Sequence, residues 1–225
     1  MMPDPSYPAE GPNFNSGLPG NSKMRKSVAL NLIYMSYELD ILAPKFGYES
    51  GQIDIQVCDA LRNKDVEAFL FNMLVQRKMS ENPNIPQEYI EHEISKVACP
   101  PKPPYYHPSG SSVDIRLWDR INKKFLNMGD FGVPWTKELS TVPTYAENIT
   151  EEQKKNRLLC VLAATRAGLV NYPNEFWHFS KYDSMSEYWN EKDPAKRKAI
   201  YDLIEQPSLD ISIDENKHFK VQEKI

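Results

Sequence analysis

Two short segments of the chain carry residue types that bind catalytic metal ions. The first runs from His107 to Asp114, and the second is Glu175-Phe-Trp-His178. Two neutral imidazoles and one carboxylate suit a borderline ion such as zinc, and three protein ligands leave a fourth tetrahedral position for a reactive water. Glu175, three residues before the second histidine, would be the base. The set therefore predicts a catalytic metal site, because a structural site would fill that fourth position.

The chain between the first two ligands must reverse its direction to reach one ion. His107 and Asp114 are seven residues apart, so a fully extended chain would separate them by roughly 23 Å. A proline, a serine and a glycine follow His107, and these residue types favour a turn. Apolar and polar residues then alternate from 113 to 118, which predicts a half-buried strand with Asp114 on the face opposite the apolar residues.

The spacing alone leaves a simpler interpretation open for each of these residues. A His-x-x-Gly or a Glu-x-x-His pattern arises by chance in many chains, and a solvated surface position would then explain it. The chain has four histidines, and two of them fall in these segments. His92 lies in a charged stretch with a helical pattern and His218 in a charged tail, so both are expected at the surface.

Four motifs, in the same order along the chain, resemble those of the D-alanyl-D-alanine dipeptidases of the VanX type, in the LAS group of metallopeptidases. The run from His107 to Asp114 followed by Ile-x-Leu resembles the zinc signature of that family. Glu175-Phe-Trp-His178 is similar to its Glu-Trp-Trp-His signature, and Leu126-Asn-Met-Gly-Asp-Phe131 resembles its Asp-Met-Gly-x-Asp-Phe stretch. Val57-Cys-Asp-Ala-Leu-Arg62 resembles the strand that delivers an active-site arginine.

The resemblance implies one zinc ion per chain, held by His107, Asp114 and His178. It implies Glu175 as general base and Arg62 as the residue that stabilises the oxyanion. A permanently charged, planar guanidinium suits the second role. From the residues alone, a surface arginine after a strand would be the default interpretation. The substrate implied is D-Ala-D-Ala, a similar small dipeptide or a peptide derived from peptidoglycan.

Three further residues are predicted to contact the substrate: Asp59, Tyr105 and Asp130. Asp59 and Asp130 fall where they could orient the arginine or bind the amino end of the substrate, and structural capping is an equally good interpretation of both. Tyr105 replaces the serine that the family has two residues before the first ligand, and Asn63 replaces the proline after the arginine. These departures leave open which peptide is cleaved.

Three functions therefore remain open. The first is hydrolysis of a small dipeptide. The second is a D,D- or L,D-carboxypeptidase or endopeptidase that acts on longer peptidoglycan stems. The third is a zinc-binding interaction protein without catalysis, like the hedgehog-type members of the same structural group. The presence of both Glu175 and Arg62 favours an enzyme.

Length and composition predict one globular domain. The chain has 225 residues, of which 40% are hydrophobic, and single domains reach about this size. A net charge of −4 gives no general attraction for nucleic acid, so no such partner is expected. The three cysteines are widely spaced and form no Cys-x-x-Cys pair, so neither a disulfide framework nor a thiolate metal site is expected. A cytoplasmic location is the simpler prediction, with a periplasmic or secreted one as the alternative.

The segment from Lys23 to Tyr37 imitates the basic and apolar regions of a signal peptide. It has no small-residue cleavage site and runs directly into acidic residues, both of which argue against that interpretation. Its apolar residues recur at helical spacing, so an amphipathic core helix is predicted, with the positions Val28, Leu32, Met35, Leu39 and Leu42 facing the core. No stretch of the chain is long enough to span a bilayer.

The whole pattern predicts a single α+β domain, in which helices pack around a small antiparallel sheet that carries the zinc site. Residues 1–22, rich in proline and glycine, are expected to form an irregular arm, and residues 23–225 the domain. A strand is expected at 53–57, running towards Arg62. Helices are expected at 64–79, 87–97 and 151–167, and Gly168 closes the last of them.

Three finer expectations concern the surroundings of the site. The helix at 64–79 should bury the face formed by Val66, Phe69, Leu70, Met73 and Leu74. The proline-rich run 100–104 should be a stiff, extended lead into the metal-binding turn. Residues 132–150 show little periodicity and should form a long functional loop beside the site.

Overall fold

The computed structural model describes residues 23–96, 98–129, 142–190, 192–197, 199–205, 209–213 and 219–223. Its α-helices are α1 (Lys26–Leu42), α2 (Lys64–Glu81), α3 (Gln87–Ile94), α4 (Glu151–Arg166) and α5 (Ser184–Asn190). Its strands are β1 (Ile53–Asp59), β2 (Ser112–Asp119), β3 (Lys124–Phe125), β4 (Val170–Asn171), β5 (His178–Ser180), β6 (Leu209–Ile213) and β7 (Phe219–Glu223). Short 3-10 turns are η1 (Ala43–Phe46), η2 (His107–Ser109) and η4 (Pro194–Lys196).

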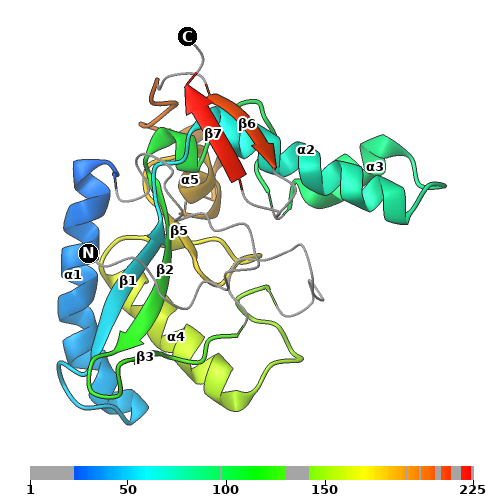
Figure 1. Ribbon diagram of the computed structural model, residues 1–225. Helices are drawn as coiled ribbons and strands as arrows, with labels where there is room; N and C mark the ends of the chain where they lie inside the picture. The colour runs from blue at the N-terminus through cyan, green and yellow to red at the C-terminus, as the bar shows by residue number, and fades with distance from the viewer. Residues whose placement is uncertain are drawn as a thin grey trace.

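The main sheet is antiparallel and small, as predicted, and the α+β class is confirmed (Figure 1). Its strands follow the order β1-β2-β5-β4, and the short β3 pairs with β2 as well. The register pairs Asp59 of β1 with Asp114 of β2, and Asp114 with His178 of β5. Directly opposite residues of antiparallel strands present their side chains on the same face. The sheet therefore gathers three polar side chains at one place.

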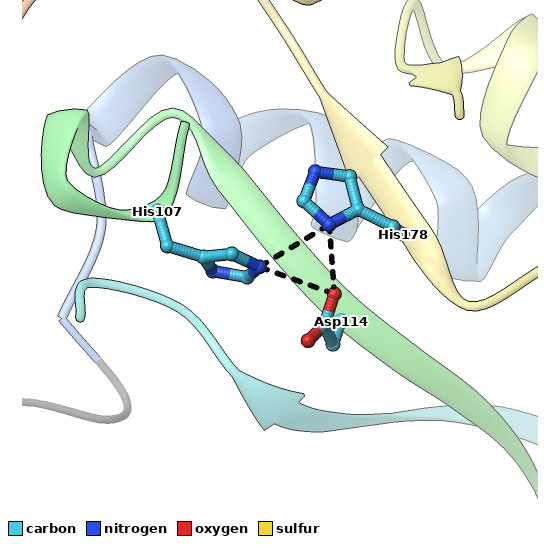
Figure 2. A group of neighbouring side chains, drawn as sticks. All are labelled: His107, Asp114 and His178. Atoms are coloured by element: carbon cyan, nitrogen blue, oxygen red, sulfur yellow. Dashed lines mark hydrogen bonds and ion pairs between the residues drawn. The ribbon is translucent and has the colours of Figure 1, made fainter. Parts of the chain in front are cut away.

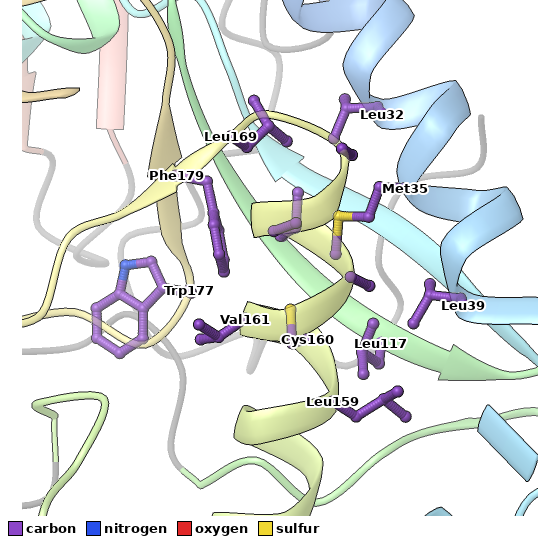
Figure 3. Close-up of a cluster of buried hydrophobic side chains, with 14 of the residues drawn as sticks. Leu32, Met35, Leu39, Leu117, Leu159, Cys160, Val161, Leu169, Trp177 and Phe179 are labelled. Atoms are coloured by element: carbon purple, nitrogen blue, oxygen red, sulfur yellow. The ribbon is translucent and has the colours of Figure 1, made fainter. Parts of the chain in front are cut away.

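The other face of the sheet forms the core. Val113, Ile115 and Leu117 alternate along β2 and are fully buried, as the period-2 pattern predicts. They pack with side chains from α1 and α4, among them Met35 and Leu159 (Figure 3). The strand is more deeply buried than expected near the site, because Asp114 itself is only 7% exposed.

Helix α1 confirms that most of Lys23 to Tyr37 belongs to a core helix, but the helix is only weakly amphipathic, because Ile33 and other large hydrophobic side chains are exposed on it. All five predicted core positions of this segment and its continuation are buried. Asn31, also buried, donates a hydrogen bond of 2.5 Å to the carbonyl of Ala167, just after the end of α4. Within the described part of the chain, no helix is long and apolar enough to cross a membrane.

Helix α4 has the ends that the sequence predicts. Thr150 and Gln153 form a capping box at its start, which satisfies two of the unpaired backbone N–H groups there. Gly168 lies just beyond the helix with a φ of +80°, a left-handed conformation that glycine adopts without strain. The three cysteines are buried and free, in agreement with the expectation of no disulfide framework.

Helix α2 starts where predicted, with the Asn63 side chain accepting a hydrogen bond of 2.8 Å from the backbone N–H of Asp65. The prediction for its buried face is wrong in part. Phe69 and Met73 are only partly buried, and the fully buried positions are Val66, Glu67, Leu70, Phe71, Leu74 and Val75. The helix is turned so that it packs against α3 and points Glu67 inwards.

Two other expectations differ from the structure, and one hairpin was not predicted. Helix α3 ends at Ile94 and is therefore shorter than the helix expected at 87–97. The proline-rich run bends instead of extending, and the Cys99 sulfur lies 3.5 and 3.4 Å from the carbonyl oxygens of Pro100 and Pro104. A hairpin of β6 and β7 lies beside α2 and was not predicted (Figure 1). Of the loop expected at 132–150, residues 132–141 lie outside the described residues, and 142–150 form neither helix nor strand.

Candidate metal centre

His107 is held at the start of the turn η2 with one ring nitrogen fixed. Its Nδ1 lies 2.7 Å from the backbone carbonyl of Ala60, which can only accept a hydrogen bond, so Nδ1 carries the proton. This leaves Nε2 as the atom with a lone pair, a common arrangement for histidines that bind metals. The reversal predicted from the sequence is a tight turn, in which the Gly110 N–H donates to the His107 carbonyl and Gly110 has a φ of +70°.

Asp114 and His178 are brought together by the register of β2 and β5. They are Cα partners, and both side chains are buried. The neighbours of His178, Trp177 and Phe179, belong to the hydrophobic core. The backbone of His178 is therefore fixed on both sides.

The three potential ligand atoms form a nearly equilateral triangle (Figure 2). His107 Nε2 lies 3.2 Å from His178 Nδ1 and 3.3 Å from Asp114 Oδ1, and the last two atoms are 3.1 Å apart. Ligands bound tetrahedrally at about 2.0–2.1 Å from a zinc ion are separated from one another by roughly 3.3 Å. The triangle therefore has the size that such an ion requires.

The electrostatics of the triangle also favour a cation at its centre. Within the described residues, Asp114 Oδ1 is buried and accepts no hydrogen bond, which is costly without a compensating charge. Burial opposes the charged form of both partners, yet the Asp114 carboxylate raises the pKa of His107 to about 9. Burial likewise opposes ionisation of Asp114, yet the two imidazoles hold its pKa well below the ordinary value. With the raised pKa of His107, a proton on its Nε2 competes with a cation for the same position.

Glu175 lies beside the triangle without being part of it. Its Oε2 is 3.5 Å from His178 Nδ1, and its side chain is 13% exposed. Burial raises the pKa of Glu175 well above the ordinary value, and the nearby charge of Asp114 raises it further. A tight turn fixes the residue, because its N–H donates to the Tyr172 carbonyl and its carbonyl accepts from the N–H of His178.

Arg62 reaches the triangle from the end of β1. Its Nη2 is 3.7 Å from Asp114 Oδ2, the carboxylate oxygen that does not belong to the triangle. Asp59 Oδ2 accepts hydrogen bonds from both Nε and Nη2 of Arg62, at 2.9 and 2.6 Å. Of the roles considered for Asp59, the geometry favours orientation of Arg62. Burial disfavours a charged guanidinium, but the carboxylates of Glu67, Asp59 and Asp114 raise the pKa of Arg62 well above its usual value.

The sequence analysis missed Glu67, whose Oε2 lies 2.8 Å from Arg62 Nη1. Glu67 is 4% exposed, although it is a charged residue in the first turn of α2. One signal could have found it. It is three and seven positions before Leu70 and Leu74, so an acidic residue interrupts an otherwise apolar helix face.

The remaining two predicted site residues receive no support from the described part of the structure. Tyr105 is half-buried two residues before His107, and its side chain makes no hydrogen bond within the part of the chain that the structure describes. Asp130 lies outside the described residues, as does His218. His92 is exposed on α3, as predicted.

Comparisons with known proteins identify the family. Residues 22–196 match the model of the peptidase M15 family, described as D-ala-D-ala dipeptidase. A D-alanyl-D-alanine dipeptidase from Synechocystis sp. is 26% identical over 132 residues, a match that covers 51% of this chain and 51% of that protein. The chain thus spans about half the length of this relative. With a family match over most of its length, the chain belongs to the M15 peptidases, a family of metal-dependent peptidases.

Proposed function

We propose that the chain is a zinc-dependent dipeptidase that hydrolyses the peptide bond of D-Ala-D-Ala or a similar small dipeptide. The observation that carries the proposal is a triangle of ligand atoms 3.1 to 3.3 Å apart, next to the mostly buried carboxylate of Glu175 and the mostly buried guanidinium of Arg62. The triangle alone would suit a structural ion as well. The added acid–base group and fixed positive charge are what peptide hydrolysis requires.

The ligand set fits zinc, because it combines two imidazoles with one carboxylate and leaves a fourth position open. When bound by His107, Asp114 and His178, zinc supplies a Lewis acid that lowers the pKa of water towards ~7 and polarises a carbonyl. Glu175 accepts a proton from the attacking water and delivers it to the leaving nitrogen as the C–N bond breaks. Burial and the neighbouring Asp114 carboxylate raise the pKa of Glu175, and a carboxylate with a raised pKa accepts a proton more readily.

Arg62 has the complementary role. Its guanidinium stabilises the negative charge that develops on the carbonyl oxygen, from a position 3.7 Å from the second oxygen of Asp114. Asp59 holds it there through two hydrogen bonds. Tyr105, half-buried beside the metal-binding turn, is proposed to contact the substrate, and Asp130 keeps the same proposed role from the resemblance alone.

The test compares substrates of different length with and without metal. Chelator-treated protein is incubated with D-Ala-D-Ala or with a pentapeptide stem ending in D-Ala-D-Ala, before and after one equivalent of zinc is added, and released D-Ala is measured. We expect zinc to restore cleavage of the dipeptide. Cleavage of the stem without cleavage of the dipeptide would support a carboxypeptidase instead. Stoichiometric zinc binding without hydrolysis of either would support an interaction protein.

A further inference from the structure

Glu67 is a buried carboxylate that the ligand set and the acid–base step do not use. It lies in the first turn of α2, where the partial positive charge of the helix N-terminus favours an acidic residue. Burial of a second carboxylate beside Arg62 is nevertheless costly, because Asp59 already neutralises the guanidinium. A charge that is 4% exposed in this setting calls for a role beyond simple pairing.

The hydrogen bonds of Arg62 show what Asp59 alone cannot do. Both bonds from Arg62 to Asp59 end on the same oxygen, Oδ2. The other oxygen, Oδ1, accepts the backbone N–H of Ala60 at 2.8 Å. When one oxygen accepts both hydrogen bonds, the guanidinium can rotate about that oxygen and still keep its hydrogen bonds to Asp59. Glu67 Oε2, at 2.8 Å from Nη1, supplies a second fixed point on another edge of the guanidinium.

We propose that Glu67 is a positioning residue for Arg62. The proposal rests on the proposed function, in which Arg62 stabilises the oxyanion. With Asp59 and Glu67 on two edges, the guanidinium is fixed in the orientation that directs Nη2 towards Asp114 and the ligand triangle. Glu67 acts through Arg62 and needs no contact with the substrate. A fixed donor lowers the reaction barrier more than a mobile one, because it requires no reorientation in the transition state.

Two substitutions of Glu67 test whether its charge and its reach are both required. Glu67→Gln keeps the size and an acceptor oxygen but removes the charge, whereas Glu67→Asp keeps the charge on a shorter side chain. We expect both to lower kcat by roughly 10- to 100-fold, the usual cost of losing such a supporting residue. KM and bound zinc should stay within a few-fold of the parent, because the lost interaction belongs to the transition state. Normal kcat in Glu67→Asp or Glu67→Gln would overturn the proposal.

Glu81 provides the matched control. It lies at the other end of α2 and also pairs with an arginine, because its Oε1 is 2.9 Å from Arg77 Nε, but this pair is exposed. Glu81→Gln should leave kcat unchanged. A loss of kcat in this control equal to that in Glu67→Gln would show that any change to α2 impairs the enzyme, and would overturn the specific role of Glu67.

A double-mutant cycle tests whether Glu67 acts through Arg62. In the background of Arg62→Ala, Glu67→Gln should cause no further loss of kcat, because the residue that it positions is gone. A full additional loss would mean that Glu67 acts directly on the substrate or on the fold.

A measurement without substrate keeps this proposal distinct from the proposed function. The Nε–H of Arg62, which is hydrogen-bonded to Asp59, should give a separate, slowly exchanging ¹⁵N NMR signal in the parent. Glu67→Gln should broaden it or speed its exchange, and Glu81→Gln should not. An unchanged signal in Glu67→Gln would overturn the positioning role even if the parent hydrolyses D-Ala-D-Ala. A changed signal in a parent without hydrolysis would support the positioning and reject only the enzymatic function.

Discussion

Two groups of polar residues meet on the same face of the sheet, and they are built in different ways. The metal triangle joins His107 to two residues that are direct partners on β2 and β5, so backbone pairing sets the position of Asp114 and His178. The arginine clamp, which consists of Arg62, Asp59 and Glu67, joins the end of β1 to the start of α2 through side-chain hydrogen bonds.

This difference predicts how each group responds to substitution. In the triangle, strand register places the ligands, so a removed side chain should leave the geometry of the others intact while metal is lost. In the clamp, each partner holds the next, so a removed side chain should release its neighbours while metal is kept. Metal content and turnover should therefore separate the two groups.

The largest effect is expected at the triangle. His178→Ala removes one of three ligands, so bound zinc should fall from one equivalent to near zero, and turnover should fall by roughly 10³-fold or more, which corresponds to the several kcal/mol that a catalytic metal supplies. The far-ultraviolet circular dichroism spectrum should persist, because Trp177 and Phe179 still hold β5 in the core. Metal analysis checks the assignment, and full zinc occupancy in this variant would contradict it.

The next effect concerns Glu175, which lies beside the triangle but is not a ligand. Glu175→Ala should lower turnover by roughly 10²- to 10⁴-fold, the range for loss of a general acid–base residue. Zinc should remain bound at one equivalent. Turnover within a few-fold of the parent would assign the proton transfer to another residue.

Substitution of Arg62 tests the clamp directly. Arg62→Ala should lower turnover by roughly 10²- to 10³-fold, as loss of one oxyanion donor does, with zinc retained. Arg62→Lys should recover little, because lysine lacks the planar fork that reaches Asp59 and Glu67 at the same time. Near-normal turnover combined with a lowered melting temperature would show a structural role instead.

The two groups also differ in how far the sequence predicts them. The ligands of the triangle were predicted because their residue types lie in two short segments that resemble the signatures of a known family, and alternation along 113–118 gave the face of Asp114. Glu67 was missed because its role depends on how α2 is rotated against α3. Helical periodicity correctly placed Val66, Leu70 and Leu74 inside. It could not decide whether the neighbouring buried positions were Phe69 and Met73 or, as observed, Glu67, Phe71 and Val75.

The bend of the proline-rich run was missed for a related reason. Proline restricts its own φ angle, which favours an extended run, but the run bends so that the Cys99 sulfur contacts two of its carbonyl groups. Such contacts depend on the packing of the whole loop, and no spacing rule predicts them.

A smaller effect is expected from pH, again at the triangle. Burial opposes the charged imidazolium, but the Asp114 carboxylate raises the pKa of His107 to about 9, so below that pH the metal-free protein holds a second proton on this ring, at Nε2. Zinc must displace this proton, and its apparent affinity should fall about tenfold for each pH unit below 9 through this group alone. Competition titrations with a chromophoric chelator between pH 6.5 and 9 measure this slope, and an affinity independent of pH would contradict it.

The same shift affects the stability of the metal-free protein. Because the pKa of His107 is raised in the folded state, its proton stabilises the fold fully below the unfolded pKa of about 6.5, and this contribution is lost as pH rises to about 9. The chelator-treated protein should therefore lose stability over this range relative to the zinc-loaded protein.

The smallest effect is expected at the base of the clamp. The side chain of Asn63 accepts a hydrogen bond from the N–H of Asp65 and so caps the helix that carries Glu67. Asn63→Ala should lower the free energy of unfolding by about 1 kcal/mol, the typical cost of losing such a cap. Because Glu67 and the rest of the first turn remain, turnover should change by less than the 10-fold expected for Glu67→Gln. Urea unfolding and steady-state kinetics on the same variant provide the measurement. A loss of turnover as large as that of Glu67→Gln, without a loss of stability, would place Asn63 in the clamp itself.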